Sequence, residues 1–203
     1  TIERRLGQRP TSFRAGRYGL SIAGARILTK LGYLVDSSVI PFTDYSAEGG
    51  PDYLSAPYKP YRIGKDDLCA PATEGSLLEV PVSVGFSWPR FSWAMRIARW
   101  AGMRAFRHLR VTGILDRLNL VRRIKFSPEL ADAERMRQLV DAYVANRAPC
   151  MVMILHSSSL MPGCSPYAAS ERQLDTLCQR LAATFAYCLE KHGMVSRTLT
   201  DFA

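Results

Sequence analysis

The spacing of hydrophobic residues in the first part of the chain predicts a helix followed by a strand. Over residues 19–30 the apolar side chains recur on one helical face, and Gly32 provides a C-terminal stop. Residues 33–40 are apolar and rich in Val and Ile, and Pro41 closes the run. This pattern is typical of a buried strand in an α/β protein.

A long irregular segment separates this strand from the next one. Residues 43–76 are rich in Pro, Gly and Tyr, which argues against a helix and predicts a long functional loop with a β-excursion. Residues 77–86 then predict a second strand. Pro81 removes a backbone donor from it, which indicates a bulge or an edge position.

The second half of the chain predicts two amphipathic helices with a strand between them. Ser127 and Pro128 are residue types favoured at an N-cap and at the first helical position, and apolar residues continue at helical spacing over residues 128–147. Residues 151–155 form a short apolar run that predicts a buried strand. Ser170 is the expected N-cap of a long helix that follows.

Composition adds that the chain is globular. Strands that alternate with helices predict an α/β protein with a parallel sheet, in which functional loops follow the C-terminal ends of the strands. Of the 203 residues, 47% are hydrophobic and 22% are charged, which excludes a disordered or low-complexity chain. Five cysteines without a C-x-x-C pair indicate neither a disulfide framework nor a structural zinc site.

The net charge of +9 is concentrated in one segment. Residues 90–125 hold ten basic residues and one acidic residue, and they account for the whole excess. On a helical wheel Trp93 and Trp100 fall among the arginines, as in helices that lie on an anionic lipid surface. The alternative is a solvated face of an ordinary helix. Nucleic-acid binding is not expected, because no recognition motif accompanies the charge.

Three side chains are candidates for chemistry on position alone. His156 stands where the predicted strand 151–155 passes into a Ser-rich loop, which suits a general acid or base. Arg14 lies among small residues before a predicted helix and could hold an anion. Asp36, at the end of a predicted strand, could orient a histidine or cap a turn. Each is equally compatible with a structural role.

Four motifs in order strengthen this selection. They are RPTSFRAGRYG at 9–19, LGYLVDSSV at 31–39, LEVPVS at 78–83 and LHSSSLMPGCSPY at 155–167. Together they resemble the later part of a polysaccharide deacetylase of the NodB homology, carbohydrate esterase type. The resemblance covers nearly the whole chain. It implies a distorted β/α barrel, incomplete at its N-terminus, that forms a single partial domain over residues 1–203 with a basic amphipathic insertion at about 88–126.

The resemblance also implies roles for individual residues. Arg14 matches the arginine that pairs with the catalytic-base aspartate, and His156 matches the general acid toward the leaving amine. Leu155 matches the leucine that lines the acetyl-methyl pocket. Asp36 is near the aspartate that tunes the histidine, although the usual Asp-Trp arrangement is absent here. Tyr18 aligns loosely with the tyrosine whose backbone donates to the oxyanion.

Further residues are expected to contact substrate because of their positions. Three follow His156 on its loop and a fourth is a candidate sugar-stacking platform: Ser157, Ser165, Tyr167 and Trp88. The implied substrate is an N-acetylated glycan, such as a bacterial surface polysaccharide or its lipid-linked precursor. The implied reaction is metal-dependent N-deacetylation.

The implied cofactor is a divalent metal, with zinc expected. In the family an aspartate and two histidines bind it upstream of the arginine motif, but only thirteen residues precede Arg14 here and the metal motif does not occur. The expectation is therefore a fragment of a longer deacetylase. The alternative is an inactive homologue or fragment that binds carbohydrate or a membrane surface.

Three further expectations concern chemistry, partners and location. A serine hydrolase built on Ser157 or Ser159 with His156 is a competing enzyme class, although the G-x-S-x-G elbow is missing. The basic residues 90–125 predict an anionic membrane surface as a partner. An incomplete barrel exposes sheet edges, which favours a homo-oligomer. The expected location is cytoplasmic and peripheral at the inner membrane.

Overall fold

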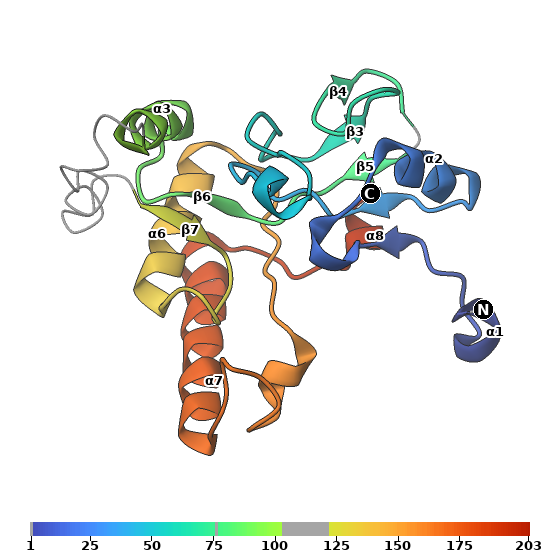
Figure 1. The fold of residues 1–203 in the computed structure, drawn as a ribbon. Coiled ribbons are helices and arrows are strands. Elements are labelled where there is room, and N and C mark those ends of the chain that lie inside the picture. The colour runs from blue at the N-terminus through green and yellow to red at the C-terminus, as the bar shows by residue number, and fades with distance from the viewer. Residues whose placement is uncertain (1, 76, 103–121) are drawn as a thin grey trace. The chain divides into compact units, whose positions relative to one another are not determined.

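The computed structural model describes residues 2–75, 77–102 and 122–203, which form two compact units (Figure 1). Unit 1 consists of Thr1–Ser83 and Ser196–Ala203, and unit 2 consists of Val84–Val195. Both contain helices and strands, so the chain is mixed α/β. The described strands do not close into a barrel. The distorted barrel and the single partial domain therefore stay predictions.

Unit 1 is built on a five-stranded mixed sheet. Its strands, in spatial order, are β1 (Ser12–Phe13), β2 (Val35–Asp36), β5 (Leu78–Glu79), β3 (Tyr61–Ile63) and β4 (Pro71–Ala72). The first three are parallel to one another, whereas β3 runs antiparallel to both β5 and β4. The expectation of a parallel sheet therefore holds only for β1, β2 and β5. Their C-terminal ends share one edge of the sheet.

A single helix packs beside this sheet. Helix α2 (Ile22–Lys30) begins where the Ser21 hydroxyl accepts a hydrogen bond from the Gly24 N–H at 3.1 Å. Gly32 ends it with φ at 78°, a conformation that glycine adopts without strain. The buried face of α2 joins the hydrophobic cluster of unit 1, which consists of Leu20, Ala25, Leu28, Tyr61, Ile63, Leu68 and Leu77. The helix predicted over residues 19–30 is confirmed, and it begins after Ser21, its N-cap.

The remaining elements of unit 1 are short. They are α1 (Ile2–Leu6), the 3-10 turns η1 (Gly16–Tyr18) and η2 (Ser46–Glu48), and α8 (Leu199–Phe202). The Thr11 and Thr200 hydroxyls lie 2.8 Å apart and connect α8 to the segment before β1. Residues 43–76 contain η2, β3 and β4, so the predicted β-excursion within this loop is confirmed.

The described part of unit 2 combines a two-stranded ribbon with helices. Strands β6 (Val84–Phe86) and β7 (Arg123–Lys125) pair in antiparallel fashion. The helices are α3 (Phe91–Gly102), α6 (Ala133–Ala145) and α7 (Glu171–Ala186), and α7 continues into the π-helix η4 (Tyr187–Lys191). Helix α6 packs against both strands on one side and against α7 on the other (Figure 1).

The core of unit 2 lies where α6 and α3 meet β6. Leu139 and Tyr143 of α6 are almost completely buried, and the Tyr143 hydroxyl donates to the Val84 carbonyl oxygen at 2.9 Å. The Phe91 ring of α3 lies 5.6 Å from that of Tyr143 between ring centroids. Gly85 of β6 lies against these side chains, because a Cβ there would approach Phe91 to 2.6 Å and Leu139 to 2.8 Å.

Gly85→Ala is expected to destabilise unit 2 by about 1–3 kcal/mol. The added methyl group would overlap two core side chains that have little room to move, which is the usual cost of overpacking. Urea unfolding followed by circular dichroism measures the change. Gly16→Ala is the matched control, because no atom lies within 4 Å of the Cβ it would add. Equal stability of the Gly85 variant and the wild type would contradict this packing.

Three elements differ from the sequence-based expectations. The predicted strand 77–86 divides around Pro81 into β5 and β6, which belong to different units. The predicted helix 128–147 begins one turn late, because Asp132 rather than Ser127 caps it by accepting from the Arg135 N–H. Residues 151–155 belong to no described strand, although the Ile154 N–H donates to the Phe126 carbonyl oxygen.

Part of the predicted basic insertion falls within the structure. Helix α3 confirms a helix at its start, whereas residues 103–121 lie outside the described residues. The Ser170 cap and the long helix after it are confirmed. Across the described ranges, the helices are too short or too polar to cross a membrane.

Candidate functional site

In unit 1 the shared edge of the three parallel strands gathers polar side chains. Arg14 directly follows β1, Asp36 ends β2 and Glu79 ends β5. The Arg14 guanidinium donates to Ser37, from Nε to the carbonyl oxygen at 2.9 Å and from Nη2 to the hydroxyl at 2.8 Å. Because parallel strands present their C-terminal ends together, two residues selected from the sequence, Arg14 and Asp36, lie in one cluster.

Two carboxyl groups are completely buried in this cluster. Asp36 and Glu79 are partners in the β2–β5 register. Asp36 accepts from Ser38, from its N–H at 2.9 Å and its hydroxyl at 2.7 Å. Glu79 Oε1 accepts from the Val39 N–H at 3.0 Å, whereas Oε2 meets no hydrogen-bond partner within the described residues. No N–H or O–H of the described residues donates to this oxygen, so a hydrogen bond between Glu79 and the Asp36 carboxyl group requires a proton on one of the two acids.

The electrostatics of the pair follow from its burial. Desolvation raises the pKa of Glu79 well above its ordinary value, and the Asp36 carboxyl group raises it further. The Val39 N–H and Arg14 oppose this shift and are the weaker influences. Burial also lowers the pKa of Arg14, against the opposing effects of Tyr18, Asp36 and Glu79. Burial and the adjacent carboxyl group therefore both favour the protonated form of Glu79.

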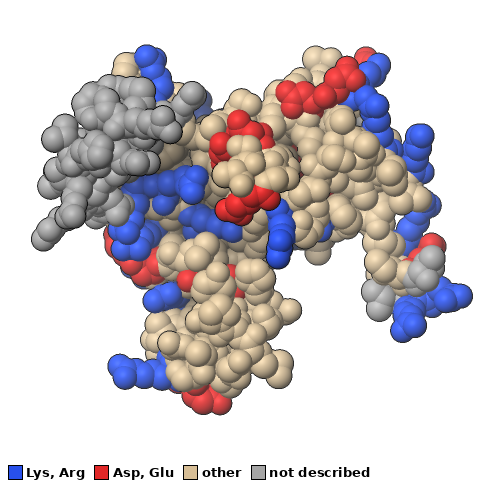
Figure 2. All heavy atoms as spheres, in the orientation of Figure 1, with Lys and Arg blue, Asp and Glu red and all other residues tan. Residues whose placement is uncertain are grey.

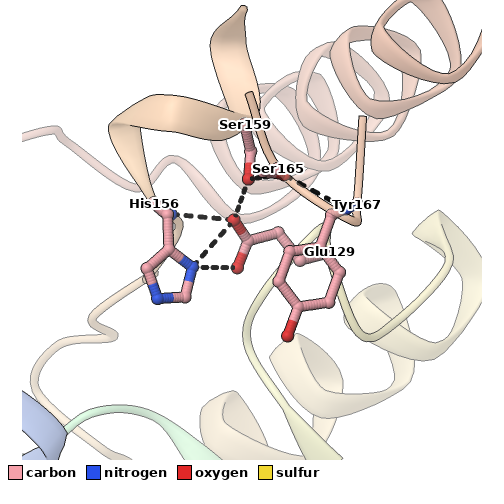
Figure 3. Close-up of polar contacts among 5 residues, drawn as sticks. All are labelled: Glu129, His156, Ser159, Ser165 and Tyr167. Carbon is pink, nitrogen blue, oxygen red and sulfur yellow. Dashed lines mark hydrogen bonds and ion pairs between the residues drawn. The ribbon is translucent and has the colours of Figure 1, made fainter. Parts of the chain in front are cut away.

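In unit 2 a second cluster forms around a histidine and a buried glutamate (Figure 3). His156 Nδ1 lies 3.1 Å and 3.0 Å from the two carboxyl oxygens of Glu129, and the His156 backbone N–H donates to Oε1 at 2.8 Å. The Glu129 side chain is 4% exposed and that of His156 is 66% exposed. The carboxylate therefore holds the ring from the protein side while the rest of the imidazole faces outward.

Two serines complete the surroundings of Glu129. The Ser159 hydroxyl, which is completely buried, donates to Glu129 Oε1 at 2.5 Å and lies 2.8 Å from the Ser165 hydroxyl. Ser165 in turn accepts from the Tyr167 N–H at 3.1 Å. The Tyr167 ring lies nearly parallel to the His156 ring, at 8° and with centroids 6.1 Å apart. Through these contacts the loop after His156 holds the His156 and Glu129 side chains in position.

Local structure explains why Glu129 reaches His156. Residues 128–130 form a turn instead of the predicted first helical turn, and Ser127 accepts from the backbone N–H groups of Leu130 and Ala131. After His156 the 3-10 turn η3 (Ser157–Leu160) brings Ser159 back toward the same carboxylate. Hydrogen bonds from Ser159 and His156 lower the pKa of Glu129 although burial, the largest single influence, raises it.

The geometry suits proton transfer at one nitrogen of His156. Nδ1 is held by Glu129, whereas Nε2 points away from it (Figure 3) and has no hydrogen bond to the described residues. A carboxylate beside Nδ1 fixes the orientation of the ring, so that Nε2 is the nitrogen left exposed. An exposed Nε2–H is therefore available to protonate a leaving group, and the neutral ring is able to take a proton back.

The same geometry does not form a serine nucleophile. Ser159 is buried and its hydroxyl bonds to Glu129 rather than to His156. Ser157 is exposed, and its hydroxyl has no hydrogen bond to His156 in the described part of the chain. A serine hydrolase needs a hydroxyl bonded to the base. In this conformation the described residues therefore lack the serine–histidine hydrogen bond that the competing serine-hydrolase interpretation requires.

Tyr18 lies in unit 1 with its backbone already engaged. Its N–H donates to the Ala15 carbonyl at 3.2 Å, and its carbonyl oxygen accepts from the Tyr53 hydroxyl at 2.6 Å. Its ring stacks on Tyr45 at 5.9 Å between centroids. The N–H that the resemblance assigns to the oxyanion is therefore occupied in this conformation.

The other residues selected from the sequence lie in unit 2. Leu155 is half-buried and directly precedes His156, and Trp88 is half-buried just after β6. The carboxylate bonded to His156 is Glu129, which sequence reasoning did not select; the tuning role assigned to Asp36 stays a prediction. Glu129 is 27 residues from His156, and no local pattern joins them. Glu79 had a visible signal, because it is a charged residue inside an apolar run.

A third group of titratable residues joins α6 to the π-helix. Asp141 accepts from the Tyr187 hydroxyl at 2.9 Å and 2.8 Å and lies 2.9 Å from His192 Nε2. Bonds from Tyr187, His192 and Lys191 together lower the pKa of Asp141 although burial, the first cause, raises it. These contacts connect two packed helical elements, which indicates a structural role for His192.

The side chains in the described ranges do not fit a divalent metal. No group of three or more His, Cys, Asp or Glu side chains converges on a point within residues 2–75, 77–102 and 122–203. Zinc sites use at least three such ligands. The expected zinc therefore has no set of ligands there.

Comparison of the chain with protein-family models, with curated proteins and with solved structures gives no significant match.

Proposed function

We propose that this chain supplies the general acid for hydrolysis of an N-acetyl amide on a sugar, as in a polysaccharide deacetylase. The observation that carries the proposal is the His156–Glu129 pair, with Nδ1 held by the carboxylate and Nε2 exposed. Support also comes from the position of His156 in the motif at 155–167. Breaking an amide bond requires a proton on the departing nitrogen, because an unprotonated amide anion is a very poor leaving group.

The proposed step is a single proton delivery. Water adds to the acetyl carbonyl carbon and gives one proton to the base that Arg14 is proposed to orient. The resulting tetrahedral intermediate breaks its C–N bond while the protonated His156 donates from Nε2 to that nitrogen. The base then releases its proton to solvent, and the neutral His156 takes one up from solvent. The products are acetate and the free amine of the sugar. Glu129 holds the ring in position through Nδ1 during the transfer.

The loop around His156 is the proposed place for the sugar. Tyr167 lies beside the imidazole and offers an aromatic surface, and Ser157 is exposed at the start of η3. Leu155, Ser165 and Trp88 complete the proposed contacts in unit 2. Arg14 and Asp36 lie in unit 1 and keep the roles that the resemblance implies. Arg14 is proposed to orient the catalytic base, and Asp36 is proposed to tune the histidine.

Acetate release from an N-acetylglucosamine tetramer tests the proposal. The complete protein that contains this chain is expected to release acetate and to expose free amine in equal amounts, and a serine-reactive phosphonate is expected not to inhibit it. Ser159→Ala serves as the companion variant, because it removes the one buried serine bonded to Glu129 without touching Nε2.

Two outcomes contradict the proposal. Inhibition by the phosphonate favours a serine hydrolase. Binding of the glycan without acetate release, from this substrate and from a surface polysaccharide, favours the inactive carbohydrate-binding homologue.

A further inference from the structure

Helix α3 has one face that is fixed against unit 2. Phe91 and Ala94 are buried, and the Phe91 ring lies 6.2 Å from the Phe86 ring of β6 between centroids. Below this ring Gly85 leaves no space for a larger residue. Two neighbouring elements, β6 and α6, therefore determine the rotation of α3 about its own axis.

The fixed rotation places an indole and a guanidinium outside. Trp93 is 54% exposed, which is unusual for the largest apolar side chain. The Arg96 guanidinium carbon lies 5.2 Å from the centroid of the Trp93 ring, within cation–π range. Arg90, just before the helix, is also exposed. Figure 2 shows Lys and Arg side chains gathered on the upper part of unit 2 in this view.

The charge of this region has one sign. The sequence contains no Asp or Glu from residue 80 to residue 115, which includes all of α3. A helix that carries arginines and no acidic residue of its own is complementary to a negatively charged partner. The exposed Trp93 adds a requirement, because its indole gains by leaving water while its N–H stays hydrated. The headgroup region of a bilayer meets both conditions.

We propose that unit 2 docks onto an anionic lipid bilayer through α3, with Trp93 at headgroup depth and Arg90 and Arg96 against lipid phosphates. An amphipathic helix normally enters the interface by its apolar face. Here that face is occupied by Phe91 and Ala94 in the core, so the contact is shallow and depends on one indole and on charge. Docking of this kind is reversible and sensitive to salt.

Vesicle co-sedimentation of the full chain tests the proposal. Binding is expected to vesicles of phosphatidylcholine with 30% phosphatidylglycerol, about tenfold or more above binding to phosphatidylcholine alone, and it is expected to weaken as salt rises. Arg96→Ala is expected to lower the partition coefficient about fivefold, the usual contribution of one basic residue at an anionic surface. Trp93→Ala is expected to lower it by a similar factor.

Arg172→Ala is the matched control. It removes the same charge from an exposed position on α7 and is expected to bind as the wild type does. Equal losses for the Arg96 and Arg172 variants would attribute binding to net charge alone and overturn the proposal. Equal binding to neutral vesicles would overturn it too, and so would tighter binding to duplex DNA than to anionic vesicles.

A second measurement uses a variant that keeps an aromatic ring at position 93. Brominated lipid is expected to quench tryptophan fluorescence of the wild type and to quench Trp93→Phe clearly less. Because Trp93 and Arg96 are exposed, the variants are expected to keep the circular dichroism spectrum of the wild type. Undiminished quenching in Trp93→Phe contradicts the placement of Trp93 in the interface.

Discussion

Replacing His156 with alanine is expected to reduce acetate release by about 10²-fold or more. General acid catalysis by a positioned side chain typically contributes about 10²- to 10⁴-fold, and Nε2 of His156 is the exposed nitrogen of a ring held by a buried carboxylate. The loss is expected in kcat, because the proton is needed at bond breaking and not for substrate binding. Steady-state acetate release by the complete protein measures it.

Glu129→Gln separates positioning from proton transfer. The variant keeps an oxygen for the Ser159 hydroxyl and the His156 N–H but loses the charge beside Nδ1. We expect a smaller loss, about tenfold, in keeping with one hydrogen bond to a charged group. The loss is expected in kcat with KM unchanged, because Glu129 contacts the His156 ring at Nδ1 and not at the exposed Nε2. A loss that appears in KM as well would contradict this positioning role.

Ser158→Ala is the matched control for both variants. Ser158 is an exposed residue of η3, the 3-10 turn that follows His156. Its hydroxyl makes no hydrogen bond to His156 or Glu129 in the described chain. It is expected to keep wild-type turnover. Near-normal acetate release by His156→Ala would refute the role of His156 as the proton donor.

Glu79→Gln is expected to stabilise the protein by about 1–3 kcal/mol at neutral pH. The wild type buries a carboxyl whose Oε2 has no partner in the described residues, next to a second buried carboxyl. A glutamine keeps an oxygen for the Val39 N–H and carries no charge. The expected gain is the usual cost of one buried group without its hydrogen bond.

The pH dependence gives this prediction a sign. The pKa of Glu79 is raised in the folded protein above its ordinary value of 4.5. Above pH 4.5 the unfolded chain has lost this proton while the folded chain still holds it, so the folded state binds more protons. Stability of the wild type therefore falls as pH rises from 4.5 through the raised folded pKa. Glu79→Gln is expected to remove this part of the slope.

Urea unfolding of the wild type and variant between pH 5 and pH 8.5 measures both effects. Glu48→Gln is the matched control, because Glu48 is an exposed carboxylate of the same unit. It is expected to leave the stability and its slope unchanged. A Glu79 variant that is less stable across the whole range would show that the carboxyl group is needed by its surroundings.

The helices were largely predictable from the sequence because their signals are local. Ser21 before α2 and Ser170 before α7 are capping residues within three positions of the N–H groups they accept from. Apolar spacing then indicated which face of each helix packs inward. The start of α6 was missed because two candidate caps, Ser127 and Asp132, lie one turn apart, and local preference does not choose between them.

The strands were less predictable. Apolar runs at residues 33–40 and 77–86 were read as single strands, but the ladder bonds cover only two or three residues at a time. Pairing depends on which segment lies alongside, and Pro81 marks where one run leaves the β5 ladder before β6 begins. Residues 151–155 have strand composition but do not belong to a described strand.

Local sequence patterns were sufficient to select Arg14, Asp36 and His156, because Asp36 and His156 were expected at strand ends and Arg14 lies among small residues before a helix. Their partners emerge only in the folded chain. Glu129 reaches His156 across 27 residues through a turn, and Glu79 meets Asp36 because two parallel strands are in register. Propensity and periodicity act over a few neighbouring residues, whereas hydrogen bonds and buried charges depend on distances in space. The chemistry of this protein therefore depends on contacts that no short stretch of its sequence contains.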